Sequence, residues 1–400
     1  MKIKVGVIFG GESVEHEVSI ISAIQAMNKM DQEKYEIVPI YITKDREWYT
    51  GEMLRDIDTY QDMSLIKKYA KNVILYCKKG YFVLQTKGLF KRVVKDIDIA
   101  FPIVHGTNVE DGVLQGYLQS LGIPYVGSSV YASVVGQDKI YMKQVFDSED
   151  LPMAKYVWFY DVDYKEDSDL VISKINKLKY PVIVKPATLG SSVGISAAKN
   201  ESELKEAIED AIRYDNRIVV EEMVKNLVEV NISVLGNYEN QSTSEIEQVI
   251  SGEDFLTYEE KYIGNGKTKG KIGATASKGM LSATRKIPAE IDSKLADEVR
   301  DVAVRAFRAL GSSGVCRIDF LIDSKNNKAY INEINSIPGS LAFYLWEPKG
   351  KKYTELLDDM INIAIKDYKK RTNKVHSFDS NILAGYAGIK GLKGTKGIKK

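Results

Sequence analysis

The chain has 400 residues, 44% of them hydrophobic and 28% charged, and its formal net charge at pH 7 is +1. A chain of this length is expected to form two or three packed units, and its balanced charge argues against nucleic acid as a partner. No apolar run approaches the roughly 18 residues of a membrane span, so none is expected. Cys77 and Cys316 lie far apart without a partner motif, which predicts two core thiols and a cytoplasmic protein.

The first third of the sequence alternates predicted strands with predicted helices. Ile20, Ile21, Ile24 and Met27 recur at spacings of three and four, as on the buried face of a helix. This alternation predicts a mostly parallel, doubly wound sheet that binds ligands at the carboxyl ends of its strands. Strands are predicted at residues 2–9, 34–42, 97–106 and 123–129, a hairpin at 72–86 and a second helix at 113–122. Together they form an N-terminal α/β domain over residues 1–135.

Two smaller α+β domains are predicted after it, a central one over residues 136–225 and a C-terminal one over residues 226–372. In the C-terminal domain an amphipathic helix ends at Gly311, and a strand–turn–strand hairpin follows over residues 315–335. The long polar segment near 263–282 is expected to act as a mobile cover over a site.

Residues 377–400 form a tail of unusual composition. Between residues 381 and 400 there are five lysines and no acidic residue, and Gly recurs at every third position from Gly385. These few proline-free triplets cannot form a triple helix, and the tail has little apolar surface to bury, which predicts disorder. Its lysines allow at most a weak contact with an anionic surface.

A Gly/Ser-rich turn at residues 190–194 stands between two predicted strands, with Lys185 just before it. Its spacing differs from that of the P-loop, in which the lysine follows the glycines and opens a helix. Taken alone, the stretch is compatible with an ordinary hairpin turn or with a loop that binds phosphate. The hairpin is the simpler interpretation until other residues of the chain are considered.

The hairpin at 315–335 carries the clearest chemical signal. Alternation places Arg317 and Asp319 on one face, and a turn centred near Asn326 would bring Glu333 opposite Asp319, with Asn335 on the same face as Glu333. Like charges directly opposed across a sheet are destabilising. Two carboxylates and an amide oxygen are, however, suitable ligands for Mg²⁺. The alternatives are a solvated hairpin face, or a register that differs by a residue or two.

Lys139 and Lys185 each begin or precede a segment that is predicted to be buried. A buried lysine costs free energy unless an anion meets it, although a lysine can also extend to the surface. Two such lysines, a Gly-rich turn and a magnesium site together favour a nucleoside triphosphate as ligand.

Seven motifs in a fixed order resemble the D-alanine–D-alanine ligases of the ATP-grasp superfamily, over residues 1 to about 368. They are GGESVEHEVSIISA (10–23), HGTNVEDGVLQGYLQSLGIPYVGSS (105–129), QDK (137–139), PVIVKPATLGSSVG (181–194), FLTYEEKY (255–262), CRIDF (316–320) and NEINSIPGS (332–340). The resemblance implies an ATP-grasp fold behind an N-terminal doubly wound (pre-ATP-grasp) domain. It implies ATP and D-alanine as substrates, Mg²⁺ or Mn²⁺ as cofactor, a homodimer, and a role in peptidoglycan synthesis.

The resemblance also implies a role for each matching residue. ATP would contact Lys139, Lys185, Ser192, Glu221, Glu222, Val224, Glu229 and Lys261. The metal ion would be held by Asp319, Glu333 and Asn335. Catalysis would involve Glu15, Ser191, Tyr262, Arg317 and the backbone of Gly339. The amino-acid substrates would contact Val18, His105, Tyr344 and Leu345.

One departure concerns the second substrate. Many members of the family continue after the motif that ends at Gly339 with a Ser/Thr-rich stretch that binds the carboxylate of that substrate, whereas Tyr344 and Leu345 stand at those positions here. Lys261 and Tyr262 resemble the dipeptide-forming branch. The expected product is D-alanyl-D-alanine. The alternatives are a different second amino acid or hydroxy acid, another carboxylate–amine ligase of the superfamily, or an adaptor with a vestigial nucleotide site.

Overall fold

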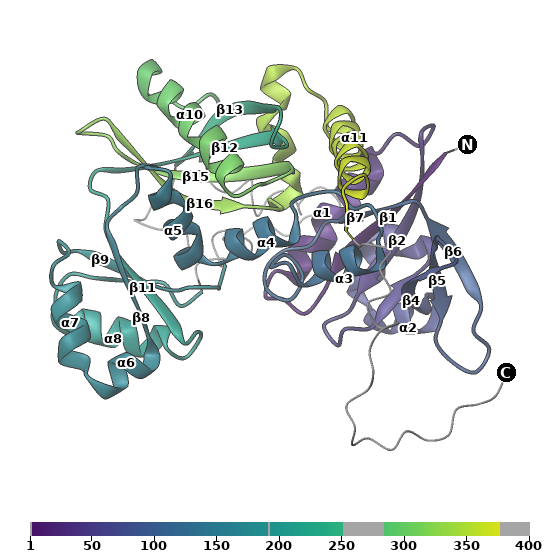
Figure 1. The fold of residues 1–400 in the computed structure, drawn as a ribbon, viewed down its shortest axis with the longest axis horizontal. Helices are drawn as coiled ribbons and strands as arrows, with labels where there is room; N and C mark the ends of the chain where they lie inside the picture. Colours follow the sequence, from purple (N-terminus) through teal and green to yellow (C-terminus); the bar gives the residue numbers. More distant parts are fainter. Residues whose placement is uncertain (1, 191–192, 251–283, 377–400) are drawn as a thin grey trace, which may run out of the picture.

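The computed structural model describes residues 2–190, 193–250 and 284–376, which form three β-sheets with helices packed against them (Figure 1). A seven-stranded sheet comes first, a four-stranded sheet forms a separate lobe, and a five-stranded sheet lies between the two along the top of the view. This mixed α/β arrangement confirms the predicted fold class. In the described residues, no helix combines the length and apolar character needed to cross a membrane.

The N-terminal sheet has the strand order β6-β5-β4-β3-β2-β1-β7 and is mixed. Strand β1 (Ile3–Gly10) pairs in parallel with β2 (Tyr35–Ile42) and β7 (Ile99–Pro102). The expectation of a mostly parallel sheet is wrong for the other half, in which β3 (Trp48–Thr50), β4 (Lys71–Lys78), β5 (Tyr81–Thr86) and β6 (Val93–Ile97) pair antiparallel. Two of the connections there, β2–β3 and β4–β5, are too short for the crossover that parallel strands need.

Other N-terminal expectations hold in part. The hairpin predicted at 72–86 is confirmed as β4 and β5. The strand predicted at 123–129 is reduced to a single parallel bridge between Ala100 and Tyr125. Cys316 is buried as expected, but Cys77 is exposed, so the prediction of two core thiols is wrong for Cys77. The short helical elements of this region are η1 (Glu52–Arg55), η2 (Ile57–Gln61), α2 (Met63–Tyr69), α3 (Val113–Leu121) and α4 (Val130–Gln137).

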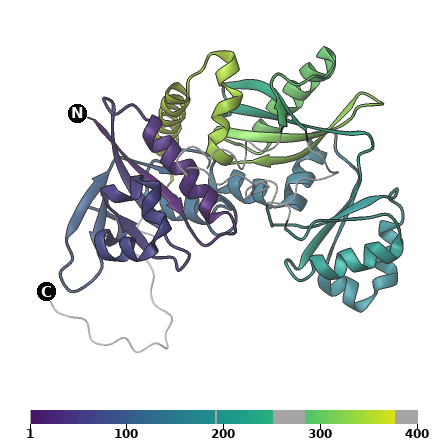
Figure 2. The ribbon, with the colours of Figure 1, turned by 180° about the vertical axis from the view of Figure 1, so that it is seen from behind.

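The N-terminal core includes residues from the far end of the chain. Helix α1 (His16–Lys29) buries Ile20, Ala23 and Met27 against the sheet, which confirms its predicted apolar face. Helix α11 (Tyr353–Thr372) contributes Leu356 and Ile361 to the same core. Seen from behind, α11 lies beside α1 at the boundary of the N-terminal and C-terminal sheets (Figure 2). The first and last helices therefore hold the two ends of the fold together.

The central sheet is antiparallel, in the order β10-β9-β11-β8. Its strands are β8 (Tyr156–Tyr160), β9 (Val182–Pro186), β10 (Ser196–Ala198) and β11 (Arg217–Glu222). Strands β9 and β10 pair directly, so the segment containing the Gly/Ser-rich turn does connect two antiparallel strands. Helices α6 (Asp161–Glu166), α7 (Ser168–Ile175) and α8 (Glu201–Ala211) pack on this sheet, and Asn200 caps α8 through a bond from the Glu203 amide.

The C-terminal sheet has the order β14-β13-β12-β15-β16 and is antiparallel throughout. Its strands are β12 (Leu227–Gly236), β13 (Gln241–Ile250), β14 (Thr284–Lys286), β15 (Gly314–Asp323) and β16 (Lys328–Asn335). One face is apolar and packs on α10 (Ser293–Ala309), whose Leu295, Val299 and Val302 are buried as predicted, and on Met142 and Phe146 of α5 (Lys139–Ser148). The opposite face is left for polar side chains.

Candidate active site

A row of polar residues crosses the open face of the C-terminal sheet. The strand register places Glu247 opposite Asn231, Asn231 opposite Asp319, and Asp319 opposite Glu333. The predicted pairing of Asp319 with Glu333 is therefore confirmed. The pairing depends on a β-bulge after Asp319, which makes Asn332 the additional residue on β16. Asn332 Oδ1 accepts a hydrogen bond from Lys185 Nζ at 3.2 Å, so the bulge also links this sheet to the central one.

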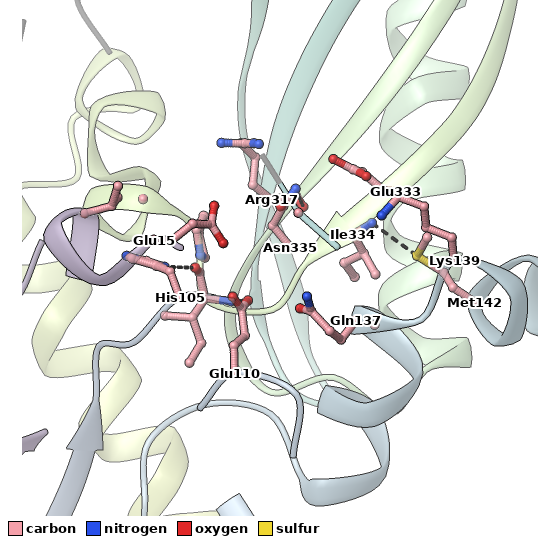
Figure 3. Close-up of a pocket in the computed structure, with 16 residues that line it drawn as sticks. Glu15, His105, Glu110, Gln137, Lys139, Met142, Arg317, Glu333, Ile334 and Asn335 are labelled. Carbon is pink, nitrogen blue, oxygen red and sulfur yellow. Dashed lines mark hydrogen bonds between the residues drawn. The ribbon is translucent and has the colours of Figure 1, made fainter. Parts of the chain in front are cut away.

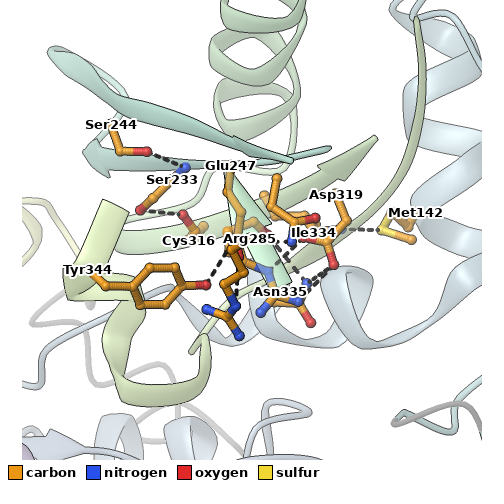
Figure 4. A network of polar contacts seen from close by, with 12 residues as sticks. Met142, Ser233, Ser244, Glu247, Arg285, Cys316, Asp319, Ile334, Asn335 and Tyr344 are labelled. Atoms are coloured by element: carbon orange, nitrogen blue, oxygen red, sulfur yellow. Dashed lines mark hydrogen bonds and ion pairs between the residues drawn. The ribbon is translucent and has the colours of Figure 1, made fainter. Parts of the chain in front are cut away.

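Asp319 is the centre of a charged network (Figure 4). Arg317 donates to both of its oxygens, from Nε at 2.7 Å and from Nη2 at 2.8 Å, and Asn335 Nδ2 donates to Oδ2 at 3.1 Å. Burial opposes the charge of Arg317, but Asp319 raises the pKa of its guanidinium well above the usual value. Opposed carboxylates of Asp319 and Glu333 beside the Asn335 amide form a hard oxygen donor set that fits Mg²⁺ or Mn²⁺.

A cavity of about 90 Å³ opens beside this network, between the N-terminal and C-terminal sheets (Figure 3). The catalytic candidates Glu15 and Arg317 both line it. A Cβ atom built on Gly190, at the start of the Gly/Ser-rich turn, would lie 3.2 Å from Glu15 Oε2, so the turn reaches this carboxylate. The cavity lining includes eight predicted site residues: Glu15, Val18, His105, Lys139, Arg317, Glu333, Asn335 and Gly339.

The segment around Gly339 is held in place by the N-terminal domain. Ser340, Leu341 and Ala342 in η4 (Gly339–Leu345) all have left-handed backbones, with φ of 51°, 54° and 49°. Each such residue costs roughly 1–2 kcal/mol when it is not glycine. Ser22 Oγ accepts from the Ser340 amide at 2.9 Å and contacts His105 Nε2 at 3.1 Å. These contacts oppose the strain.

His105 and Glu110 complete this attachment. His105 Nδ1 lies 2.8 Å from the Ile337 carbonyl oxygen. Glu110 accepts three bonds, from the Gly106 amide at 3.0 Å, the Ile337 amide at 2.9 Å and the Ser336 hydroxyl at 3.0 Å. The Ser336–Ser340 segment is thus fixed at both ends by side chains of the N-terminal domain.

The titration of Glu110 gives a pH prediction. Burial, assisted by the charge of Glu15, raises its pKa from 4.5 to about 7 against the effect of its three donors. Between these values the folded protein holds a proton that the unfolded chain has lost, so rising pH destabilises the fold by about 3 kcal/mol in total. The stability of wild type relative to Glu110→Gln should fall by this amount from pH 4.5 to above 7. Urea unfolding of both proteins across this range measures it, and a constant difference would contradict it.

A cluster of buried lysines surrounds Glu221 in the central domain. Lys143 Nζ lies 3.3 Å from Glu221 Oε2, and Lys185 Nζ lies 3.3 Å from Oε1. Lys139 Nζ donates to the carbonyl oxygen of Leu189, just before the Gly/Ser-rich turn. All three lysines and Glu221 are at most 7% exposed. This confirms that Lys139 and Lys185 are buried rather than extended to the surface.

Glu221 is outnumbered by the three lysines around it, and the charges of Glu333 and Asp138 also act on Lys139. Burial alone would raise the pKa of Glu221, but Lys143 and Lys185 outweigh it and lower the pKa to about 2. Burial lowers the pKa values of Lys139 and Lys143 against the opposing charges of Glu221 and Glu333, and the charge of Lys185 lowers them further. An incoming polyanion would relieve this repulsion, which makes the cluster suited to a polyphosphate.

Comparison with known proteins decides the family. The models "D-ala D-ala ligase N-terminus" and "D-ala D-ala ligase C-terminus" match residues 4–128 and 145–362. The D-alanine–D-alanine ligase of Thermosipho melanesiensis is 37% identical over 381 residues, covering 95% of this chain and 98% of that protein. The chain belongs to the D-alanine–D-alanine ligase family.

Solved structures agree with membership of the D-alanine–D-alanine ligase family. The ligase from Coxiella burnetii is 28% identical with a TM-score of 0.77, covering 93% of this chain and 96% of its own. The VanG D-Ala:D-Ser ligase of Enterococcus faecalis is also 28% identical, with a TM-score of 0.75, covering 91% of this chain and 100% of its own. The ligase fold thus extends over nearly the whole chain.

The remaining predicted residues of the ligase site lie around the cavity or outside the described residues. Glu222 and Val224 stand at and just beyond the end of β11, and Glu229 is half-buried on β12. Tyr344 and Leu345 do not line the cavity. Tyr344 instead donates to Glu247, and Leu345 is fully buried. Four residues lie outside the described ranges, namely Ser191, Ser192, Lys261 and Tyr262.

Sequence reasoning missed several polar residues of the site. Glu110 lies inside the motif at 105–129 without an assigned role, and Lys143 follows Lys139 by one helical turn, which was a usable signal. The position of Asn332 depends on a β-bulge, and no sequence pattern predicted this bulge. The contacts of Glu247 and Arg285 depend on the pairing of distant strands.

Proposed function

We propose that the protein is an ATP-dependent ligase that joins two D-alanines into D-alanyl-D-alanine for peptidoglycan synthesis. The observation that carries the proposal is the opposed pair Asp319 and Glu333, beside a cavity that Arg317 and Lys139 line. The family match over nearly the whole chain supports the same conclusion. Arg317 compensates the charge of Asp319, and Glu333 opposite it keeps the second carboxylate that a divalent cation needs, which argues against a vestigial site.

ATP is proposed to bind between the central and C-terminal sheets. Lys139 and Lys185 would contact its phosphates, and their burial without a full set of anions supports this role. Glu221, Glu222 and Val224 would line the adenine pocket. The ribose hydroxyls would meet Glu229, and the remaining phosphate contacts would come from Ser192 and Lys261.

Asp319, Glu333 and Asn335 are the residues proposed to hold Mg²⁺ or Mn²⁺. Such an ion, when bound, neutralises charge on the phosphate oxygens of ATP. The bond between Arg317 and Asp319 holds the guanidinium beside this donor set, facing the cavity. Arg317 is therefore proposed to stabilise oxygen charge that develops on the reacting groups.

The proposed reaction activates a carboxylate that resists attack by an amine. The γ-phosphoryl group of ATP is transferred to the carboxylate of the first D-alanine, giving an acyl phosphate and ADP. The amine of the second D-alanine attacks the acyl carbon, and phosphate leaves from the tetrahedral intermediate. Arg317 and the Gly339 amide are proposed to hold the oxygen of that intermediate. The contacts of Ser22 and His105 with the segment around Gly339 would fix this amide.

The first D-alanine is proposed to sit at the N-terminal side of the cavity. Glu15, Val18 and His105 line this side. Glu15 would act with Ser191 and Tyr262 in a hydrogen-bonded trio near the amino group of the substrate. Tyr344 and Leu345 are proposed to border the second substrate, where their contacts differ from those of a Ser/Thr-rich stretch.

The proposal includes the organisation and setting of the protein. Residues 1–135, 136–225 and 226–372 would form the substrate, central and C-terminal domains. A homodimer in the cytoplasm is proposed, and the exposed apolar residues of α3 and α4 offer an interface for it. They are Val113, Tyr117, Tyr131 and Val134.

A substrate screen tests the proposed function. Incubation of the protein with ATP, Mg²⁺ and D-alanine alone should release ADP and give a product with the mass of D-alanyl-D-alanine. A panel of L-amino acids and D-hydroxy acids serves as the comparison. Relatives at 37–39% identity, including those of Thermosipho melanesiensis, Thermosipho africanus and Chloroherpeton thalassium, are named D-alanine–D-alanine ligases, so a different second substrate is not favoured. Turnover that requires a second, different substrate would overturn the proposed product.

A further inference from the structure

Arg285 on β14 is held from two sides at the edge of the polar face. Its Nε lies 3.0 Å from Glu247 Oε1, and its guanidinium lies over the Tyr344 ring at 4.9 Å from the centroid. Glu247 is 1% exposed, so its carboxylate is fixed in the sheet. Together these contacts fix the direction of the Arg285 guanidinium.

The contacts of Glu247 leave the outer nitrogens of Arg285 available. The Tyr344 hydroxyl donates to Glu247 Oε2 at 3.0 Å, while Arg285 approaches the other oxygen. Burial raises the pKa of Tyr344, so its hydroxyl stays protonated and donates its hydrogen bond to Glu247. Among the described residues, nothing accepts a hydrogen bond from Nη1 or Nη2 of Arg285. Two such donors in a planar fork match the geometry of a carboxylate.

Arg285 belongs to the same polar face as the proposed reaction centre. Arg285 pairs with Val249 of β13. Glu247 lies two residues before Val249 on the same strand and pairs with Asn231 of β12. Asn231 pairs in turn with Asp319 of β15. Figure 4 shows Arg285, Tyr344 and Asn335 on one side of the sheet. Tyr344 lies in η4, the segment that begins at Gly339 in the cavity wall. A substrate that starts at the Gly339 amide can therefore extend toward Arg285.

We infer that Arg285 binds the α-carboxylate of the second amino acid, with Glu247 and Tyr344 as its positioning residues. The inference rests on the proposed ligase function and deepens it. It accounts for the departure at Tyr344, because the hydroxyl at this position here donates to Glu247, and the Tyr344 ring lies against the arginine.

Competition between two acceptors tests the inference. The protein is supplied with ATP, Mg²⁺, D-alanine and an equal concentration of D-alaninamide, which has the amine but lacks the carboxylate. Both products arise from the same activated first alanine, so their ratio by mass spectrometry reports only on the second subsite. Wild type should favour D-alanyl-D-alanine strongly. The preference should fall about 10- to 100-fold in Arg285→Ala, which loses a bidentate charged hydrogen bond.

Two further variants separate binding from a structural effect. Arg285→Lys keeps the charge without the fork and should restore part of the preference. Arg300→Ala removes an arginine that pairs with Glu245 of the same strand β13 at 3.0 Å, and should leave the product ratio unchanged. A purely structural role for Arg285 would lower the yield of both products without changing their ratio.

The outcomes distinguish this inference from the proposed function. The inference is wrong and the ligase function stands if wild type forms D-alanyl-D-alanine without preferring D-alanine to D-alaninamide as acceptor. The same conclusion follows if both Arg285 variants keep the full preference of wild type. If wild type forms no dipeptide from D-alanine, both are wrong. Thermal unfolding of each variant shows whether it is folded. If Arg285→Ala is not folded, the product ratio of Arg285→Lys decides whether the inference holds.

Discussion

Glu333→Gln is expected to lower the rate of D-alanine-dependent ADP release by about 10²- to 10³-fold. The substitution keeps the size of the side chain but removes one of the two opposed charges that make the site suitable for a divalent cation. It relieves the repulsion between Glu333 and Asp319 but also removes the carboxylate that favours the charge of buried Lys139, so the stability of the fold should change little. Steady-state ADP release at saturating D-alanine and a urea unfolding curve measure the two effects.

Glu298→Gln is the matched control, because Glu298 is exposed on α10, behind the same sheet. This control should retain full activity. Unchanged turnover in Glu333→Gln would remove the metal site from the proposal and would revive the adaptor interpretation.

The second large effect is on stability. Glu221→Ala removes the carboxylate between Lys143 and Lys185 and leaves two buried cations without a counter-charge, which should lower the free energy of unfolding by about 3–5 kcal/mol. Adding Lys143→Met to this variant removes one of those cations and should recover part of the loss. Urea unfolding of the single and double variants in the absence of nucleotide measures both changes.

Glu222→Ala is the control for this experiment. Glu222 follows Glu221 on β11, is half-buried, and accepts one bond from the Lys179 amide at 3.1 Å. Its loss should cost much less. Equal stability of the two alanine variants would mean that the lysines do not depend on Glu221.

The sequence allowed the chemical core of the site to be predicted but not its surroundings. Asp319 and Glu333 lie on one hairpin, where alternation and a short turn almost determine the register. The turn alone would still have left them misaligned, and the bulge at Asn332 restores the pair. Lys139 and Lys185 were found because a lysine in an apolar context needs an explanation.

The remainder depends on contacts between distant segments. Arg285 meets Glu247 because β14 pairs with β13, and Glu110 meets Ile337 across more than two hundred residues. No local pattern encodes such pairings. The same limit explains the N-terminal sheet, where strand and helix alternation indicated parallel pairing but short connections made half of the sheet antiparallel.

The left-handed turn at Ser340–Ala342 has a consequence for how the protein can be divided. The contacts that oppose its strain come from Ser22, and its flanking residues are held by His105 and Glu110, all three from the opposite end of the chain. A fragment containing only the later two domains lacks these partners, and the turn would relax to a cheaper conformation. Peptide-bond formation should therefore depend on the intact polypeptide, because removal of the N-terminal domain removes the partners that hold this turn.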